Sequence, residues 1–426
     1  MTQTTDTAQV LPIPHVTVQP DFKADIESRK GSFWVSSYLS GKSVHASIQV
    51  TRTIDGSAAL VSDTNSVAVS IEEDESSLRV SVEGHAQSVL LHSPNAVFGL
   101  GGKQITALDI AQSGAHVVVG GEDGLLKVFS TDPDWTETPA VFVGHFGDLT
   151  TVKFFPSSTV LLTSAMDLQL KIWDAVSGDC AMTMGPKQGG HTRPVVETAI
   201  IDRGRNIISA GKDGRVLLWE VKSATVIREL RDDVPLVGGD AVGAMCLGVK
   251  GAWYSAPNDV VIDVDEREVG TSDKLCIIGT EKGLLEVYDL ESNSVALSFT
   301  PTLMKDGITA LAYDFANGLL ALGSSTGTMQ VYNLANPSTP LYSIKRNNAA
   351  ILNIAFASAT LSDPIGLRFT TQDGSFAHII VGPNGVRVAT EYVGTDVEPL
   401  DGFSEGPNGI LVVGGREGVG RVYREI

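Results

Sequence analysis

Two neighbouring segments of this chain repeat the same polar residues at the same spacing. Each opens with Gly-His, at residues 144–145 and 190–191, and each ends with a Trp followed by an acidic residue. In both segments an Asp stands six residues before the Trp and four residues after a Thr or Ser. These positions hold His145, Thr163, Asp167 and Trp173 in the first segment and His191, Ser209, Asp213 and Trp219 in the second. Because two unrelated hairpins would not reproduce both spacings, we interpret the segments as copies of one structural unit.

A Gly-His opening with a Trp-Asp ending is typical of a four-stranded blade of a WD-repeat β-propeller. In such a blade the His precedes the innermost strand, the Ser or Thr lies in the second strand, the Asp lies in the next turn and the Trp lies in the third strand. Buried polar groups must be paired. We therefore expect each set of four side chains to form a hydrogen-bonded chain across its blade.

The same pattern recurs, less completely, along most of the chain. The copies are aligned on the residue after the Asp position, which is usually Gly, and an aromatic or apolar residue follows it five residues later. The aligned residues are Gly124, Leu168, Gly214, Gly283, Gly327, Gly374 and Gly418. The intervals are 44 to 47 residues, apart from one of 69 residues, and a WD-type blade takes about 40–45. The sequence therefore predicts an all-β fold, a seven-bladed WD-repeat β-propeller with a small N-terminal β domain.

The domain boundaries follow from changes in pattern. Residues 1–20 are polar and Thr-rich, and we expect a disordered lead there. Residues 21–86 alternate apolar and polar residues without the blade spacing, so they predict a small separate β domain. Residues 87–426 form the predicted propeller. The last blade lacks a fourth strand, so an upstream strand must close it; we expect residues 88–92, with residues 78–82 as the alternative.

The one long interval contains an insertion at about residues 251–274. It is rich in acidic residues, and insertions in repeat proteins form loops on one face that often carry function. The alternative is a merely solvated loop. The run Asp263-Val-Asp265-Glu266 lacks the spacing of a calcium-binding loop, so we expect no metal site.

Charge and composition narrow the classes of function. The formal net charge is −19, which disfavours binding to nucleic acid and to anionic membranes. The three cysteines, Cys180, Cys246 and Cys276, have no metal-ligand spacing. Neither a signal pattern nor an apolar run long enough to span a bilayer occurs. We expect a cytoplasmic or nuclear protein that is a monomer when free.

Catalytic constellations are missing from the sequence. The histidines outside the two blade units show no metal-ligand spacing, and there is no Gly-x-Ser-x-Gly nucleophile motif. The glycine-rich run at residues 120–124 lacks the Lys of a phosphate-binding loop and is interpreted as a blade turn. We therefore expect that the protein is not an enzyme and uses no cofactor.

Several longer runs resemble one family more specifically than the Trp-Asp pattern does. They are residues 154–157 (Phe-Phe-Pro-Ser), 166–173, 198–206, 266–271 (Glu-Arg-Glu-Val-Gly-Thr) and 394–399 (Gly-Thr-Asp-Val-Glu-Pro). Through these runs the chain resembles the proteasomal ATPase-associated factor family, most densely over residues 144–280. The resemblance implies a non-catalytic assembly chaperone of the base of the proteasome regulatory particle, whose partner is the C-terminal domain of one regulatory-particle ATPase. The alternative is a WD-repeat substrate receptor or scaffold in a ubiquitin-ligase complex, but the chain shows no adaptor-binding motif.

A partner site is predicted on the propeller face that carries the Asp turns and the Gly-His loops. Acidic residues gather in these turns and loops, and a small domain with basic residues would be attracted to them. The predicted binding residues are Asp396 and Glu398, then Glu266 and Glu268 of the insertion, and then Asp240, Glu281, Asp306, Asp373 and Asp401. The alternative is that these are ordinary solvated turn residues.

Overall fold

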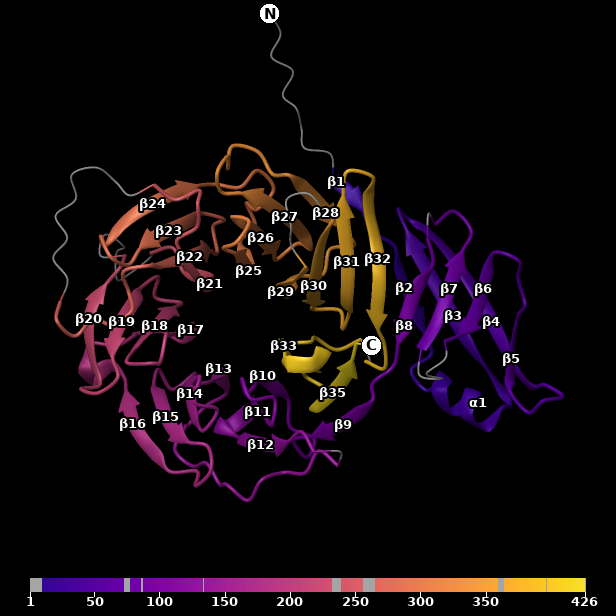
Figure 1. Ribbon diagram of the computed structural model, residues 1–426, viewed down its shortest axis with the longest axis horizontal. Coiled ribbons are helices and arrows are strands. Elements are labelled where there is room, and N and C mark those ends of the chain that lie inside the picture. The colour runs from indigo at the N-terminus through magenta and orange to yellow at the C-terminus, as the bar shows by residue number, and fades with distance from the viewer. Residues whose placement is uncertain are drawn as a thin grey trace, which may run out of the picture.

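The computed structural model describes residues 10–72, 77–85, 87–132, 134–231, 239–255, 265–358, 364–395 and 397–425. Small sheets follow one another around a ring, and a further β unit lies at one side of it (Figure 1). The described helices are α1 (Phe22–Ser28) and the short 3-10 turns η1 (Glu122–Gly124), η2 (Pro186–Gln188) and η3 (Pro407–Gly409). The all-β propeller fold is confirmed.

The first four ring sheets are antiparallel and contiguous in sequence. Sheet one is β10 (Ile105–Ile110), β11 (His116–Gly121) and β12 (Leu126–Ser130), and sheet two is β13 (Leu149–Phe154), β14 (Val160–Ala165), β15 (Leu170–Asp174) and β16 (Cys180–Met184). Sheet three is β17 (Val195–Ile201), β18 (Asn206–Gly211), β19 (Val216–Glu220) and β20 (Thr225–Glu229), and sheet four is β21 (Val242–Val249), β22 (Lys274–Thr280), β23 (Leu285–Asp289) and β24 (Ser294–Phe299).

The remaining ring sheets recruit strands from the N-terminal part of the chain. Sheet five is β25 (Ile308–Asp314), β26 (Leu319–Ser324), β27 (Thr328–Asn333), β28 (Tyr342–Lys345) and β1 (Val10–Pro12). Sheet six is β29 (Ile351–Ser358), β30 (Ile365–Thr371), β31 (Phe376–Gly382) and β32 (Gly385–Tyr392), continued by β8 (Val89–His92), β7 (Ser77–Val82) and β6 (Val67–Ile71). Sheet seven is β33 (Gly402–Glu405), β34 (Ile410–Gly414), β35 (Val419–Arg424) and β9 (Ala96–Gly99).

The closing strand is not the predicted one. Strand β9 pairs antiparallel with β35, with Gly99 opposite Val419 and Ala96 opposite Val422. A strand upstream of residue 105 does complete the last sheet, but residues 88–92 do not provide it. They form β8, whose two edges are already used, by β32 on one side and β7 on the other. The alternative, residues 78–82, lies in β7 and pairs with β6 and β8.

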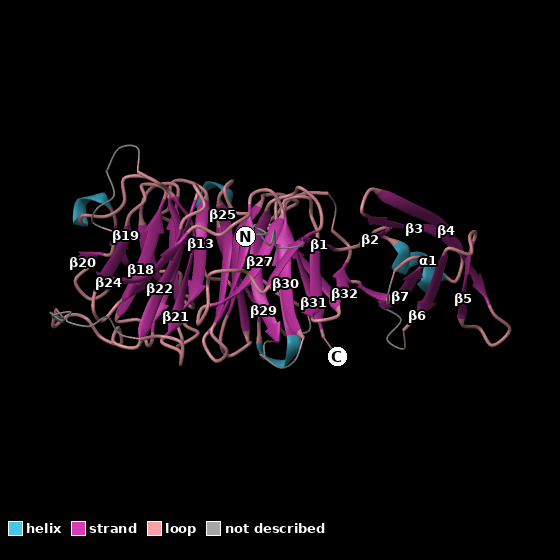
Figure 2. Cartoon of the chain, turned by 90° about the horizontal axis from the view of Figure 1, so that it is seen from above, coloured by secondary structure: helices cyan, strands magenta, loops and turns pink. Residues whose placement is uncertain are grey.

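The N-terminal unit is less separate than predicted. Its own sheet is β2 (His15–Val18), β3 (Gly31–Leu39), β4 (Lys42–Arg52) and β5 (Ala58–Ser62), while β6 to β8 extend ring sheet six into the unit. One core runs through both parts and contains Phe33 and Ile48 of the unit together with Phe369 and Ile379 of the ring. Viewed edge-on, the ring forms a disc with the unit beside it (Figure 2).

Residues 10–18 belong to this ordered core. Strand β1 pairs parallel with β28, and β2 pairs antiparallel with β3. Val16 and Val18 are both buried, because alternate residues of a strand point to one face, and Ile13, between β1 and β2, is buried as well. The predicted disordered lead is therefore wrong for residues 10–20, and residues 1–9 lie outside the described residues.

Candidate functional site

Each set of four polar residues forms one hydrogen-bonded chain. In sheet two, Trp173 Nε1 donates to Thr163 Oγ1 at 2.8 Å, Thr163 Oγ1 lies 2.7 Å from His145 Nε2, and His145 Nδ1 lies 2.9 Å from Asp167 Oδ2. A carboxylate only accepts hydrogen bonds, so Nδ1–H of His145 donates to Asp167. The Thr163 hydroxyl joins the indole N–H to Nε2 of the imidazole. Each chain thus runs from the third strand to the turn after the second.

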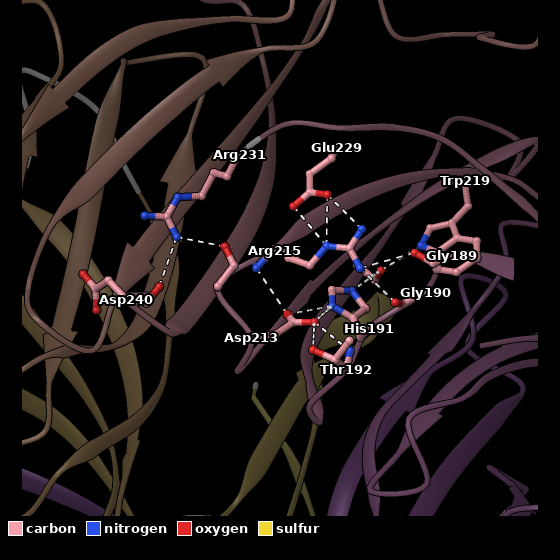
Figure 3. Close-up of polar contacts among 12 residues, drawn as sticks. Gly189, Gly190, His191, Thr192, Asp213, Arg215, Trp219, Glu229, Arg231 and Asp240 are labelled. Atoms are coloured by element: carbon pink, nitrogen blue, oxygen red, sulfur yellow. Dashed lines mark hydrogen bonds and ion pairs between the residues drawn. The ribbon is translucent and has the colours of Figure 1, made fainter. Parts of the chain in front are cut away.

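Sheet three repeats this chain with Ser209 in place of Thr163. Trp219 Nε1 donates to Ser209 Oγ at 2.8 Å, Ser209 Oγ lies 2.8 Å from His191 Nε2, and His191 Nδ1 lies 3.0 Å from Asp213 Oδ1. Around it, Arg215 Nη2 donates to Glu229 Oε2 at 2.8 Å and Arg215 Nη1 donates to the carbonyl of Gly190 at 2.9 Å (Figure 3). The turn at residues 211–215 is therefore held from several sides.

The two carboxylates also anchor the backbone of the Gly-His loops. Asp167 accepts the N–H groups of Phe146 and Gln169, both at 3.0 Å. Burial acts to raise the pKa of Asp167, but the hydrogen bonds from His145 and Phe146 outweigh it and hold the pKa below its ordinary value. Asp213 behaves in the same way. These ionised carboxylates make the loops rigid.

One face of the disc carries both the Asp turns and the loops that lead into the first strand of each sheet. We call it the turn face. In sheets two to six the residue before the Asp position donates its N–H to the carbonyl of the residue just before the first strand. These pairs are Met166 to Asp148, Lys212 to Pro194, Glu281 to Ala241, Ser325 to Gly307, and Gln372 to Ala350. Arg416 of sheet seven donates likewise to the carbonyl of Pro399.

Six of the predicted partner-binding residues lie on the turn face, but they differ in how free their carboxylates are. Glu398 and Asp306 are exposed. Glu281 is exposed but forms an ion pair with Lys212, and the Asp240 carboxylate accepts the N–H of Lys282 at 3.2 Å. The seventh turn-face candidate, Asp396, lies outside the described residues.

The carboxylates of Asp373 and Asp401 are partly enclosed. Burial acts to raise the pKa of Asp373, but hydrogen bonds from Thr371 and Asn347 hold it below its ordinary value. For Asp401 burial dominates and raises the pKa, although Arg416 lies 3.4 Å away. These two residues are therefore weaker candidates for contact with a partner than Glu398 and Asp306.

Glu266 and Glu268 lie on the opposite face, so the prediction that they share a site with the turn-face acids is wrong. The insertion joins β21 to β22, and a connection between a first and a second strand lies at the other end of the sheet from the Asp turn. Residues 256–264 of the insertion lie outside the described residues. Glu266 is exposed, whereas the Glu268 side chain is 1% exposed and forms an ion pair with Arg228 at 2.9 Å.

Two of the family-like runs meet on this opposite face. The Asn206 amide accepts the N–H of Val269 at 2.7 Å and donates to the carbonyls of Arg267 and Trp219, at 3.2 and 3.1 Å. Asn206 itself is fully buried. Residues 266–271 therefore dock on the loop between β17 and β18, and their pattern reflects local packing as well as any contact with a partner.

The structure shows two hollows that sequence reasoning missed. The central channel is a mainly polar cavity of about 320 Å³ that contains Asp109, Lys153 and Glu197; Lys153 pairs with Glu197 at 3.0 Å. A second cavity of about 430 Å³ lies between the N-terminal unit and sheet six, with Trp34 and Tyr38 on one wall. No local spacing signals either of them, because their walls come from strands distant in sequence.

Among the described residues, no group of three or more His, Cys, Asp or Glu side chains is arranged to hold a metal ion. In the same part of the chain, no helix is both long enough and apolar enough to cross a membrane.

Comparison with known proteins agrees with the repeat structure. The family model "WD domain, G-beta repeat" matches residues 92–130, 137–174 and 180–220. The first segment includes β9, the outer strand of sheet seven, the third begins with β16, the outer strand of sheet two, and all three end with the third strand of a sheet. Such overlap between repeat and blade is what closes the ring.

Two similar proteins carry proteasome names. The chain is 28% identical over 291 residues to the 26S proteasome regulatory subunit RPN14 of Saccharomyces cerevisiae, covering 67% of this chain and 66% of that protein. It is 26% identical over 392 residues to the probable proteasomal ATPase-associated factor 1 of Dictyostelium discoideum, covering 90% of each. This chain is similar to WD-repeat proteins that are named for the proteasome. The human angio-associated migratory cell protein is also similar, at 23% identity over 72% of this chain.

Proposed function

We propose that this protein is a non-catalytic assembly chaperone of the base of the proteasome regulatory particle, acting in the cytoplasm or nucleus. Its proposed partner is the C-terminal domain of one regulatory-particle ATPase subunit, bound by the turn face. The names of the yeast and Dictyostelium relatives support the assignment to the proteasome.

The observation that carries the proposed binding mode is the set of exposed carboxylates on the turn face. Glu398, Asp306 and Asp148 are exposed there. The exposed basic residues Lys187, Arg193, Lys282, Lys305 and Arg416 lie on the same face, so the face is mixed in charge and the proposed attraction comes from individual carboxylates. A small domain that presents basic residues would be guided to this face, and charge pairs of this kind chiefly set the association rate and the choice of partner.

Purified C-terminal domains of the regulatory-particle ATPases test the proposal directly. One of them should bind the full chain, and its affinity should fall as salt rises. The double variant Glu398→Lys with Asp306→Lys should bind at least about tenfold more weakly. Glu266→Lys is the control, because it makes the same kind of charge reversal at one exposed site on the opposite face.

The proposal fails if none of the ATPase domains binds the wild-type chain. If the double variant binds normally while Glu266→Lys does not, the turn face is not the binding site. Binding to a ubiquitin-ligase scaffold in place of an ATPase domain would favour a substrate receptor instead.

A further inference from the structure

We propose that Phe146 and Met166 form an apolar anchor on the turn face, which enters a pocket with a basic rim on the partner. The inference rests on the proposed function, since it takes the same ATPase domain as the partner. The inference places the apolar centre of that interface on sheet two.

Both side chains are strongly exposed. The exposed fraction is 87% for Phe146 and 52% for Met166. Single exposed apolar residues are common and need no explanation, but the two segments that carry these residues are in contact. A Cβ at Gly147 would lie 3.2 Å from the Cβ of Met166, and the N–H of Met166 donates to the carbonyl of Asp148 at 2.9 Å. The loop after His145 and the turn before Leu168 therefore present one apolar surface.

The backbone that presents this surface is rigid. The N–H of Phe146 donates to Asp167 Oδ2 at 3.0 Å, and the same carboxylate oxygen lies 2.9 Å from His145 Nδ1. Both residues thus flank the buried end of a hydrogen-bonded chain that reaches Trp173. An anchor held in place before binding loses little conformational entropy when a partner covers it, which favours affinity.

The internal repeat shows that the architecture does not require apolar residues at these positions. Thr192 is the counterpart of Phe146, because its N–H donates to Asp213 Oδ2 at 2.8 Å. The counterparts of Met166, which make the same hydrogen bond to the loop before the first strand, are Lys212, Glu281, Ser325, Gln372 and Arg416. All are polar or charged, so the apolar pair is peculiar to sheet two.

Carboxylates beside the pair indicate the chemistry of the partner. Asp148 is exposed, and its carboxylate accepts the N–H of Asp123 at 3.0 Å. Asp123, also exposed, pairs with Lys103. An apolar pocket rimmed by Lys or Arg would cover Phe146 and Met166 while pairing with these acids. A second copy of this chain fits poorly, because a symmetric contact through the same patch would bring Asp123 and Asp148 of both copies together.

The test is a charge-neutral double variant, Phe146→Thr with Met166→Gln, whose residues are copied from sheets three and six. It should bind the C-terminal domain of the cognate ATPase at least about tenfold more weakly, with a melting temperature close to that of the wild type. Val176→Thr is the matched control, because Val176 is 73% exposed in the loop between β15 and β16 on the opposite face. It should bind normally.

The outcomes separate this inference from the proposed function. If the wild type binds an ATPase domain and the folded double variant binds it equally well, the anchor is wrong and the proposed function stands. If the wild type binds none of the domains, both are wrong. If the double variant unfolds, hydrogen exchange of the wild type decides: amides 145–148 and 166–169 should become protected on binding, and unchanged exchange there overturns the anchor. A dimer of the wild type that the variant abolishes also overturns it.

Discussion

The Asp213 carboxylate lies 3.0 Å from Nδ1 of His191, and neither side chain has any exposed surface. Asp213 also accepts the N–H groups of Thr192 at 2.8 Å and Arg215 at 3.2 Å. An ionised carboxylate in the interior is stable only when such donors replace water. The pair therefore ties the Gly-His loop to the Asp turn by means of a charge, and this tie depends on pH.

Acid should weaken this tie. Burial acts to raise the pKa of Asp213, but the hydrogen bonds from His191 and from the backbone hold the pKa below its ordinary value, which is about 3.9 in an unfolded chain. A carboxyl group whose pKa is lower in the folded state stabilises the fold above the unfolded-state pKa, and this contribution is lost as pH falls through the folded-state pKa. Asp213→Asn should therefore lower the free energy of unfolding at pH 7, and the gap to wild type should narrow below about pH 4.

Urea unfolding of both proteins between pH 3 and pH 8 measures this gap. Asp306→Asn is the control, since the exposed Asp306 side chain accepts no hydrogen bond among the described residues. A gap between wild type and Asp213→Asn that stays constant down to pH 3 would contradict the role assigned to the charge.

The Trp219 indole, at the other end of this hydrogen-bonded chain, should contribute more to the stability of the fold than a hydroxyl in another sheet of the propeller. Trp219→Ala removes a fully buried ring and leaves Ser209 without its donor, so we expect a loss of about 3–5 kcal/mol in the free energy of unfolding. Tyr332→Phe deletes only the hydroxyl that donates to Gln330 Oε1 at 3.2 Å, and should cost about 1 kcal/mol. Thermal melting compares the two. If the Trp219→Ala protein had the melting temperature of the wild type, the hydrogen-bonded chain would not stabilise the third sheet.

The sequence predicts those features that depend on local spacing. His191, Ser209, Asp213 and Trp219 lie within one repeat, and strand and turn geometry alone bring them together. The closing strand is a different problem, because the apolar runs at 88–92 and 96–99 are both plausible strands. Only the distant partners β32 and β35 decide which run joins which sheet.

The candidate site shows the same limit of prediction from local sequence. Glu268 looks like one more acidic residue of an insertion, yet it is buried against Arg228, which comes from β20. Nothing near Glu268 in sequence indicates that partner. Met166, in contrast, could have been noticed from the aligned repeats, since its counterparts are polar, but an alignment does not show that it is exposed beside Phe146.

Closure of the propeller should depend on Phe98 and not on its neighbour Val97. The Phe98 ring centroid lies 4.7 Å from that of Phe129 and stacks on Trp135 at 5.8 Å, so β9 seals the junction between the last and first sheets. Phe98→Ala should cost about 3–5 kcal/mol and promote aggregation. Val97→Ala, in the same strand but at a residue 59% exposed, should stay within about 0.5 kcal/mol of wild type. Equal melting temperatures for the two variants would rule out this role for Phe98.

The ion pair between Glu268 and Arg228 should support the fold rather than bind the partner. Burial raises the pKa of Glu268 and lowers that of Arg228, so both groups are strongly desolvated. Glu268→Gln removes the carboxylate that is paired with the Arg228 guanidinium, which still donates to the carbonyl of Leu290, and we expect a loss of about 3 kcal/mol. Glu266→Gln, two residues away and exposed, should be neutral. Because both residues lie opposite the turn face, neither variant should change affinity for the ATPase domain when the protein is folded. Weaker binding by a folded Glu268→Gln protein of unchanged melting temperature would return the insertion to the partner site.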